Sequence, residues 1–276
     1  MPQVTSAQNP RLREALRLAQ SSRDRRKAGR CILEGEHLVA VYLERSGRPE
    51  TLIVEAERAA DPRIARLVAP MSPGDVLVVP RRIFAEISTL PPEVGVLAVV
   101  QTPHATPTAP ADFCLLLEDL QDPGNVGTIL RTAAAAGVGQ VHLSKLCAFA
   151  WSPKVLRAAQ GAHFLTTIVE DVDLPAWAAA FRAGGGRVLA LDPRGATDLY
   201  ASRLQRPIAI AVGNEGTGLS PALVNAADER VAIPMPGGAE SLNAAAATAV
   251  ALFECLRQRR SEGLVAPLRH SGSTIA

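Results

Sequence analysis

Short apolar runs alternate with helical patterns along most of the chain, and no other feature constrains the fold as strongly. In the second half the apolar runs cover 113–119, 140–144, 164–169, 187–192, 207–213 and 230–234. Helical patterns separate them at about 125–137, 153–160, 174–183, 220–226 and 241–259. Strands separated by helices cross over and pair side by side, so this alternation predicts a mostly parallel α/β sheet covered on both faces.

The first hundred residues carry a smaller version of the same alternation. Apolar runs there cover 31–35, 51–55, 76–80 and 94–100, and helical candidates lie near 36–45, 61–69 and 81–88. Asn9-Pro10 is typical of a helix start. A stretch rich in Pro and Thr then follows without any periodicity. We therefore expect a small α/β domain over 1–101, a linker over 102–112, a larger domain over 113–262 and a tail over 263–276.

The composition is that of a folded protein without a metal or membrane signature. Of the 276 residues 47% are hydrophobic and 20% charged, which is enough apolar material for a real core. The four cysteines form no CxxC pair and the five histidines have no ligand spacing, so we expect no metal and a reducing cytoplasm. No signal peptide is visible, and the apolar stretch 242–256 is too short to span a bilayer.

Positive charge is concentrated near the start of the chain. The stretch 11–30 holds eight Arg and Lys against two acids, a local +6 in a chain whose net charge is +2. Such a face suggests a polyanionic partner, of which a phosphate backbone is the obvious candidate, although a solvated helix face is the alternative. The candidate RNA-binding residues are Arg11, Arg23, Arg25, Arg26, Lys27 and Arg30.

The first stretch that could carry chemistry is "EDLQDPGNVGTILR" (118–131), where an apolar strand ends in acids and turns into a helix. Asn125 is well placed as the helix N-cap, and Gly127 leaves the first turn bare so that a ligand could approach the backbone. Arg131 follows about two turns into the helix. The alternative is a capped helix with a surface arginine, but the carboxyl ends of parallel strands are where such sheets bind ligands.

Two further stretches follow apolar strands in the same way. "AVGNEGTGLS" (211–220) places three glycines within six residues, which permits close backbone approach to a ligand; a tight strand-to-helix turn is the alternative. "IPMPGGAESLNAAAATAVALFE" (233–254) runs through a Pro-Gly bend into an alanine-rich helix. Ser241 can cap that helix, whereas capping leaves Asn243 without an explanation.

In this order the three stretches resemble the signature motifs of the SpoU (TrmH-like) RNA ribose 2′-O-methyltransferases, in the SPOUT superfamily. "NVGTILR" (125–131) is similar to the first motif, "GNEGTGLS" (213–220) to the second and "IPMPGGAESLNAAAA" (233–247) to the third. "NPRLREALRL" and "CILEGEHLV" look like the substrate-binding domain that often precedes them, an α/β module related to ribosomal RNA-binding proteins. The resemblance covers nearly the whole chain.

The resemblance implies a trefoil-knotted α/β fold, a homodimer formed through the C-terminal domain, and S-adenosylmethionine (SAM) bound between the second and third motif loops. Arg131 matches the family's catalytic arginine, and Asn125 and Glu215 match its supporting polar residues. The residues that match the cofactor site are Leu191, Gly213, Asn214, Gly218, Ile233, Met235, Ser241, Leu242 and Asn243. The implied reaction is methylation of a ribose 2′-hydroxyl in structured RNA, with ribosomal RNA the first expectation and tRNA the second.

A guanidinium is a poor base at neutral pH, because its pKa lies above about 12. We therefore expect Arg131 to hold a phosphate of the target nucleotide and orient the hydroxyl, while that phosphate or Glu215 accepts the proton.

Two other interpretations of the sequence stay open at this point. One is a non-catalytic RNA-binding protein that keeps the fold. The other is a Rossmann-type methyltransferase or NAD enzyme, which would need a glycine fingerprint that "EDLQDPGN" does not supply.

Overall fold

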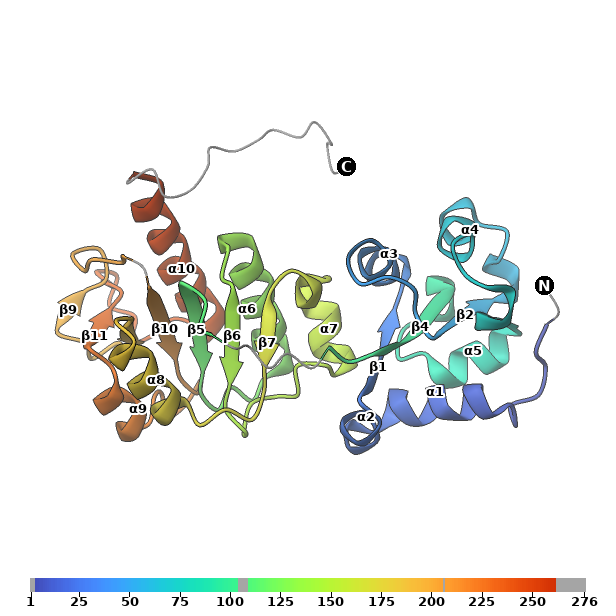
Figure 1. Cartoon of the computed structure of the whole chain (residues 1–276), viewed down its shortest axis with the longest axis horizontal. Helices are drawn as coiled ribbons and strands as arrows, with labels where there is room; N and C mark the ends of the chain where they lie inside the picture. Colours follow the sequence, from blue (N-terminus) through green and yellow to red (C-terminus); the bar gives the residue numbers. More distant parts are fainter. Residues whose placement is uncertain (1–2, 104–108, 206, 262–276) are drawn as a thin grey trace.

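The computed structural model describes residues 3–103, 109–205 and 207–261, which form two sheets side by side along the long axis of the molecule (Figure 1). The smaller sheet belongs to the N-terminal part and has the order β1-β4-β2-β3. Its strands are β1 (Arg30–Glu34), β2 (Thr51–Glu55), β3 (Val76–Val79) and β4 (Val96–Gln101). Strand β4 is antiparallel to both of its neighbours, whereas β2 and β3 are parallel.

Five α-helices accompany the smaller sheet. They are α1 (Pro10–Gln20), α2 (Ser22–Ala28), α3 (Glu36–Arg45), α4 (Pro62–Val68) and α5 (Arg81–Ile87). Helix α1 begins where the sequence predicts, because Asn9 accepts a hydrogen bond from the backbone N–H of Arg11 at 2.9 Å. Its apolar face, which includes Leu12, Ala15 and Leu18, packs in one cluster with α5 and the sheet.

The larger sheet has seven strands in the order β7-β6-β5-β10-β8-β11-β9, and all of its pairings are parallel. Its strands are β5 (Phe113–Leu117), β6 (Gln140–Leu143), β7 (Thr167–Val169), β8 (Arg187–Leu191), β9 (Thr197–Asp198), β10 (Ile208–Val212) and β11 (Glu229–Ala232). The predicted parallel α/β sheet is thus confirmed. Strand β9 was not expected, and the first half of the run 164–169 is not strand, since β7 begins only at Thr167.

Helices cover both faces of the larger sheet, as the continuous apolar runs predict. Alternate residues of β5 separate into two clusters. Leu115 joins the core shared by α6 (Pro123–Ala136), α7 (Pro153–Ala159) and α10 (Ala244–Ser261), and Leu116 joins the core under α8 (Leu174–Ala183) and α9 (Pro221–Ala226). Since every strand of the sheet points the same way, all the carboxyl ends lie along one edge, which is the edge that positions the site.

The two parts of the chain are packed against each other rather than held apart by a spacer. One buried apolar cluster runs from Leu33 and Val39 through to Leu117 and Leu156. The ring of Tyr42 meets that of Phe164 edge-on, with centroids 5.3 Å apart. Residues 102–103 and 109–112 of the expected linker carry no helix or strand, and the expected tail lies outside the described residues. No described helix is long and apolar enough to span a bilayer.

Two expectations for α6 are wrong. The helix begins at Pro123, and its N-cap is Asp122, whose carboxylate accepts from the backbone N–H of Gly124 at 2.9 Å; Asn125 lies inside the first turn. Gly127 does not face a ligand either. It is buried against α7, where an added Cβ would lie 2.7 Å from the carbonyl oxygen of Val155. The missing side chain is what lets α6 and α7 approach each other closely.

This contact gives a test of the fold. Gly127→Ala should lower the free energy of unfolding by about 1–3 kcal/mol, because the added methyl overpacks a helix contact that cannot open without shifting backbone. The matched control is Gly74→Ala, because an added Cβ there meets nothing within 4 Å. Chemical denaturation of both variants is the measurement. Equal stability of the two would contradict the close α6–α7 packing.

Candidate active site

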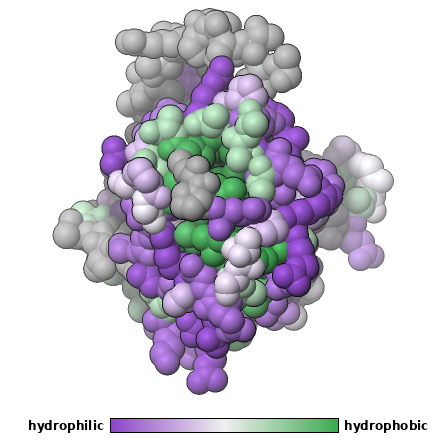
Figure 2. Space-filling model, turned by 90° about the vertical axis from the view of Figure 1, so that its right-hand side faces the viewer, coloured by the Kyte–Doolittle hydropathy of each residue, from purple (hydrophilic) through white to green (hydrophobic). Residues whose placement is uncertain are grey.

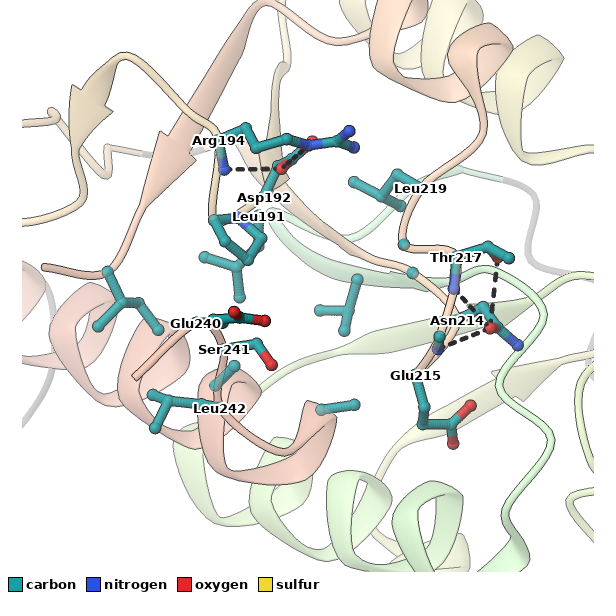
Figure 3. A pocket seen from close by; sticks show the side chains of 18 of the residues that line it. Leu191, Asp192, Arg194, Asn214, Glu215, Thr217, Leu219, Glu240, Ser241 and Leu242 are labelled. Atoms are coloured by element: carbon teal, nitrogen blue, oxygen red, sulfur yellow. Dashed lines mark hydrogen bonds and ion pairs between the residues drawn. The ribbon is translucent and has the colours of Figure 1, made fainter. Parts of the chain in front are cut away.

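A cavity of about 400 Å³ opens at the carboxyl edge of the larger sheet, between the loops that follow β8, β10 and β11 (Figure 3). Its size suits a small-molecule site, for which about 300–1,000 Å³ is usual. Eight of the nine predicted cofactor residues line it: Leu191, Gly213, Asn214, Gly218, Ile233, Met235, Ser241 and Leu242. Segments far apart in the sequence therefore meet around one space.

A chain of polar side chains ties the three motifs together beside this cavity. The side-chain amide of Asn125 donates to the Glu215 carboxylate at 3.0 Å. The Asn125 carbonyl in turn accepts from the amide of Asn243 at 2.9 Å. Asn125 is buried, which makes both bonds structurally demanding, since a buried amide without partners is unfavourable by about 1–3 kcal/mol. The first, second and third motifs are thus joined by two hydrogen bonds.

The end of this chain corrects the expected role of Ser241. Helix α10 begins at Ala244, and the Asn243 side-chain oxygen accepts from the backbone N–H groups of Ala245 and Ala246 at 2.9 and 3.2 Å. Asn243 is therefore the capping residue and does not line the cavity, whereas Ser241 does. The sequence pattern was therefore wrong about which of the two residues caps the helix.

The second motif forms a compact loop that is held by hydrogen bonds to its own Asn214 side chain. The Asn214 side-chain oxygen accepts from the backbone N–H groups of Gly216 and Thr217 at 2.9 and 3.0 Å, and its amide donates to the Asp119 carbonyl at 2.8 Å. At Gly213 an added Cβ would collide with the backbone of Gly218, and Gly218 itself has φ +73°. Glycine at both positions is therefore a requirement of the loop, which in turn shapes one wall of the cavity.

Two acids that directly follow apolar strands hold the surrounding loops. Glu118, buried at the end of β5, accepts from both the backbone N–H and the hydroxyl of Ser220 at 2.7 Å. Asp192 accepts from the Arg230 guanidinium at 2.8 Å and from the backbone N–H of Arg194 at 2.8 Å. The only sequence signal for either acid is its place directly after an apolar strand.

The charge of the cavity wall is predominantly negative. Asp192, Glu215 and Glu240 line it together with Arg194, and of the three acids Asp192 is ion-paired, with Arg194 at 3.3 Å and with Arg230 at 2.8 Å. In Figure 3 Glu240 and Ser241 face the space from one side, opposite the loop that carries Glu215. Burial raises the pKa of Glu215, but hydrogen bonds from Asn125 and from nearby backbone N–H groups outweigh this effect and hold the pKa below its ordinary value. The site is thus prepared for a cationic ligand.

Arg131 is not part of this cavity in its own chain. It lies exposed on α6, and the described part of the chain offers it no hydrogen bond or ion pair. Six residues separate it from Asn125, which at 3.6 residues per turn places the two on different faces of the helix. No group of His, Cys, Asp or Glu within the described residues is arranged to hold a metal ion.

The expected RNA-binding residues differ widely in their exposure and in their hydrogen-bond partners. Arg25 is buried, and its guanidinium donates to the carbonyl oxygens of Leu18 and Ala19, so its assignment as an RNA contact is corrected. Arg11 donates to the carbonyl oxygen of Glu50 and the hydroxyl of Thr51.

The remaining four cations are exposed or half-exposed. Arg30 is paired with Glu14 and Glu50 at 2.7 Å each, whereas Arg23 and Lys27 face solvent. Arg26 lies over the ring of Phe149. Arg13 and Arg17, which the candidates omitted, are also exposed, and their outward positions on α1 were readable from its periodicity. The end of the molecule that carries the N-terminal domain is hydrophilic around an apolar centre (Figure 2).

Comparison with known proteins places this geometry in one family. Residues 112–253 match the SpoU rRNA Methylase family, and residues 9–98 match the MRM3-like substrate binding domain. An uncharacterized tRNA/rRNA methyltransferase of Synechocystis sp. is 35% identical over 93% of this chain and 94% of its own length. The 23S rRNA (guanosine(2553)-2′-O)-methyltransferase RlmP of Bacillus subtilis is 31% identical over 92% of this chain and 98% of its own.

The fold agrees with these matches. The SpoU methyltransferase AviRb from Streptomyces viridochromogenes, solved in complex with the cofactor AdoMet, superposes with a TM-score of 0.82 at 28% identity. The superposition covers 92% of this chain and 99% of AviRb. With three motif loops meeting at the carboxyl edge of a parallel sheet, and a matching domain in front of it, this chain belongs to the SpoU rRNA methylase family.

Proposed function

We propose that this protein transfers a methyl group from SAM to a ribose 2′-hydroxyl in structured RNA, with ribosomal RNA as the first substrate and tRNA as the second. One observation carries the proposal. The second and third motif loops enclose an acid-lined cavity, and the Glu215–Asn125–Asn243 chain joins them to the first motif. Relatives named as rRNA 2′-O-methyltransferases, which cover over nine-tenths of this chain, support the substrate class. A cytoplasmic location is part of the same proposal.

The residues present fit SAM. Leu191, Leu219 and Ile233 supply apolar wall for an adenine ring, and Glu240 supplies negative charge for a sulfonium or an ammonium group. When bound there, SAM supplies a methyl group already activated by the positive sulfur, so the protein's task is to position the acceptor. Holding two reactants in line can contribute roughly 7–11 kcal/mol relative to a bimolecular encounter.

Within this site Glu215 acts as a positioning residue. Its pKa is lowered, and its oxygens already accept from Asn125 and from the backbone N–H groups of Gln121 and Asp122 at 3.4 and 3.3 Å. A carboxylate so well solvated by the protein is a weak base. A phosphodiester is a weaker base still, so the hydroxyl proton passes to Glu215 itself or to a phosphate of the target nucleotide that Arg131 holds in place. Asn125 then fixes the first-motif helix relative to the cavity.

We propose a homodimer formed through the C-terminal domain, because the site is incomplete in one chain. Arg131 lies outside its own cavity, and a second copy can bring its α6 to that opening. Exposed apolar side chains on the same domain support such an interface, among them Leu242 at 41% and Phe253 at 48% exposure. An isologous two-fold contact would complete both sites at once.

We propose also that the C-terminal segment is threaded as a trefoil knot. Close approaches between non-neighbouring segments support it. An added Cβ on Gly195 would lie 2.7 Å from the backbone of Val231, and the Gln258 side chain of α10 bonds the backbone of Ser202 and Leu204 at 3.1 and 3.0 Å. The loop 192–204 therefore closes over β11 and against α10.

Arg131→Ala should abolish methyl transfer and leave SAM affinity nearly unchanged, because the guanidinium acts on RNA and not on the cofactor. Arg131→Lys should stay below about a tenth of wild-type kcat, since an ammonium lacks the planar fork that grips phosphate at two points. Single-turnover methylation and calorimetric SAM titration measure the two effects. Near-normal kcat in the lysine variant would refute the two-point contact.

Subunit mixing tests where Arg131 acts. Arg131→Ala chains keep an intact cavity, and Gly213→Asp chains keep the arginine but lose the loop that shapes the cavity. If Arg131 serves its partner's cavity, each mixed dimer has one complete site, and equal mixing restores about a quarter of wild-type activity. Activity no higher than that of the separate variants would place Arg131 in its own chain's site. Urea-induced subunit exchange followed by methylation assays is the measurement.

The lowered pKa of Glu215 predicts a pH-dependent stability. Since the folded pKa lies below the ordinary value of 4.5, ionised Glu215 stabilises the fold above that pH, and the stabilisation is lost as pH falls through the lowered pKa. The difference in Tm between wild type and Glu215→Gln should thus be constant near neutrality and shrink in acid. In an Asn125→Ala background the difference should be smaller, because that hydrogen bond is gone. Thermal melts at stepped pH are the measurement, and an unchanged difference in acid would contradict it.

A further inference from the structure

A second cavity, of about 340 Å³, lies at the junction of the two domains. The N-terminal domain contributes Arg26 and the backbone at Gly29, and the larger domain contributes Phe149, Trp151, Glu170 and Asp171. None of these residues belongs to the site described above. Arg25 also lines the cavity, but its buried guanidinium is held by the carbonyl oxygens of Leu18 and Ala19. The lining thus combines two arginines, two aromatic rings and two carboxylates, which is a set suited to a flat polar ring.

Arg26 and Phe149 form a stacking surface. The guanidinium carbon lies 4.2 Å from the centroid of the phenyl ring, and 40% of the Arg26 side chain is exposed. Its ion pairs with Glu170 and Asp171 are long, at 3.8 and 3.4 Å, so neither carboxylate holds the guanidinium closely. Unstacked bases bind on aromatic faces and on guanidinium planes, and the Arg26 guanidinium, backed by the Phe149 ring, offers its exposed outer face here.

Glu170 adds a hydrogen-bond acceptor beside that surface. One oxygen accepts from the backbone N–H of Ala150 at 3.0 Å, which fixes the carboxylate, and the side chain is only 18% exposed. An ionised carboxylate can only accept. Guanine is the base whose Watson–Crick edge presents two adjacent N–H donors, so a fixed carboxylate favours guanine over adenine.

The position of this cavity connects it to the active site. Phe149 follows β6 and Glu170 follows β7, so both lie at the same carboxyl edge as Glu215, which follows β10. Strand β7 is three places from β10 in the sheet, or about 14 Å at the usual strand spacing. A short length of single-stranded RNA can span that distance.

We propose that the junction cavity binds an unstacked guanine of the substrate RNA, a few nucleotides from the ribose that is methylated. The inference rests on the proposed function for the identity of the RNA substrate. It assigns Arg26 to a base rather than to the phosphate backbone, and it gives the N-terminal domain a role in choosing the site.

Trp151 provides a direct readout, because it lines the cavity and the chain has only one other tryptophan, Trp177. In a Trp177→Phe protein, GMP should change Trp151 fluorescence saturably, AMP should do so more weakly, and ribose 5-phosphate should have no effect. Equal responses to GMP and ribose 5-phosphate would show an anion site only and overturn the proposal. So would the absence of any response to GMP.

Variants separate stacking from hydrogen bonding. Phe149→Leu, which keeps an apolar filling group, should weaken GMP binding about fivefold or more. Glu170→Gln should reduce the preference of GMP over AMP toward equality, while Arg82→Ala, at an exposed arginine of α5 outside the cavity, should change neither. Loss of GMP binding in Arg82→Ala would overturn the proposal. SAM titration and thermal melts confirm that each variant is folded.

The fluorescence test uses neither SAM nor methyl transfer, so the two proposals can fail separately. Absence of the GMP response, with methyl transfer intact, removes the base site alone. Absence of methyl transfer, with the GMP response intact, removes the proposed activity and leaves the base site. A rRNA fragment that crosslinks to Phe149 through a guanine would support both.

Discussion

The site depends on one directed chain of hydrogen bonds. Backbone N–H groups at the start of α10 donate to Asn243, Asn243 donates to Asn125, and Asn125 donates to Glu215. An asparagine side chain can donate and accept at the same time, which is what each interior link of such a chain requires. The carboxylate can only accept, so it must stand at the end. Segments more than a hundred residues apart are thereby held in one arrangement. The shape of the cavity depends on that arrangement.

How far the sequence predicts this site follows from simple geometry. Apolar strands separated by helices give a parallel sheet, and parallel strands end at one edge, so the three motifs had to lie along that edge. The strand order, which brings them together, does not follow from the alternation. The caps were harder to predict because Asp122 and Asn125 are both good capping residues. Pro123 favours the earlier start, and Asn125 is drawn instead to Glu215, ninety positions away. The prediction that Gly127 faces a ligand was wrong because this residue packs against α7, and no local sequence pattern reveals that contact.

The charged N-terminal stretch shows a different limit. A run of arginines predicts an exposed basic face, yet Arg25 folds back on the carbonyls of Leu18 and Ala19 and is buried. Its neighbour Arg26 crosses to the other domain and lies on Phe149. The run of arginines therefore supplies both a buried side chain that holds backbone carbonyls and exposed positive charge. Of the exposed cations, Arg26 lies on α2, which faces the loops after β6 and β7, whereas Arg13 and Arg17 lie on α1, which packs on the smaller sheet.

The separation of Arg131 from the cavity has an electrostatic consequence. SAM carries net positive charge, and the cavity wall carries Glu215 and Glu240 besides the ion-paired Asp192. A guanidinium inside the cavity would oppose binding of the sulfonium, by an amount that grows as the site is desolvated. Because Arg131 lies outside its own cavity, the proposed homodimer would bring the partner's arginine only to the opening, where solvent screens its charge. An RNA phosphate would neutralise that arginine as it arrives. The acidic wall and an arginine at the opening would thus let one site attract two ligands of opposite charge.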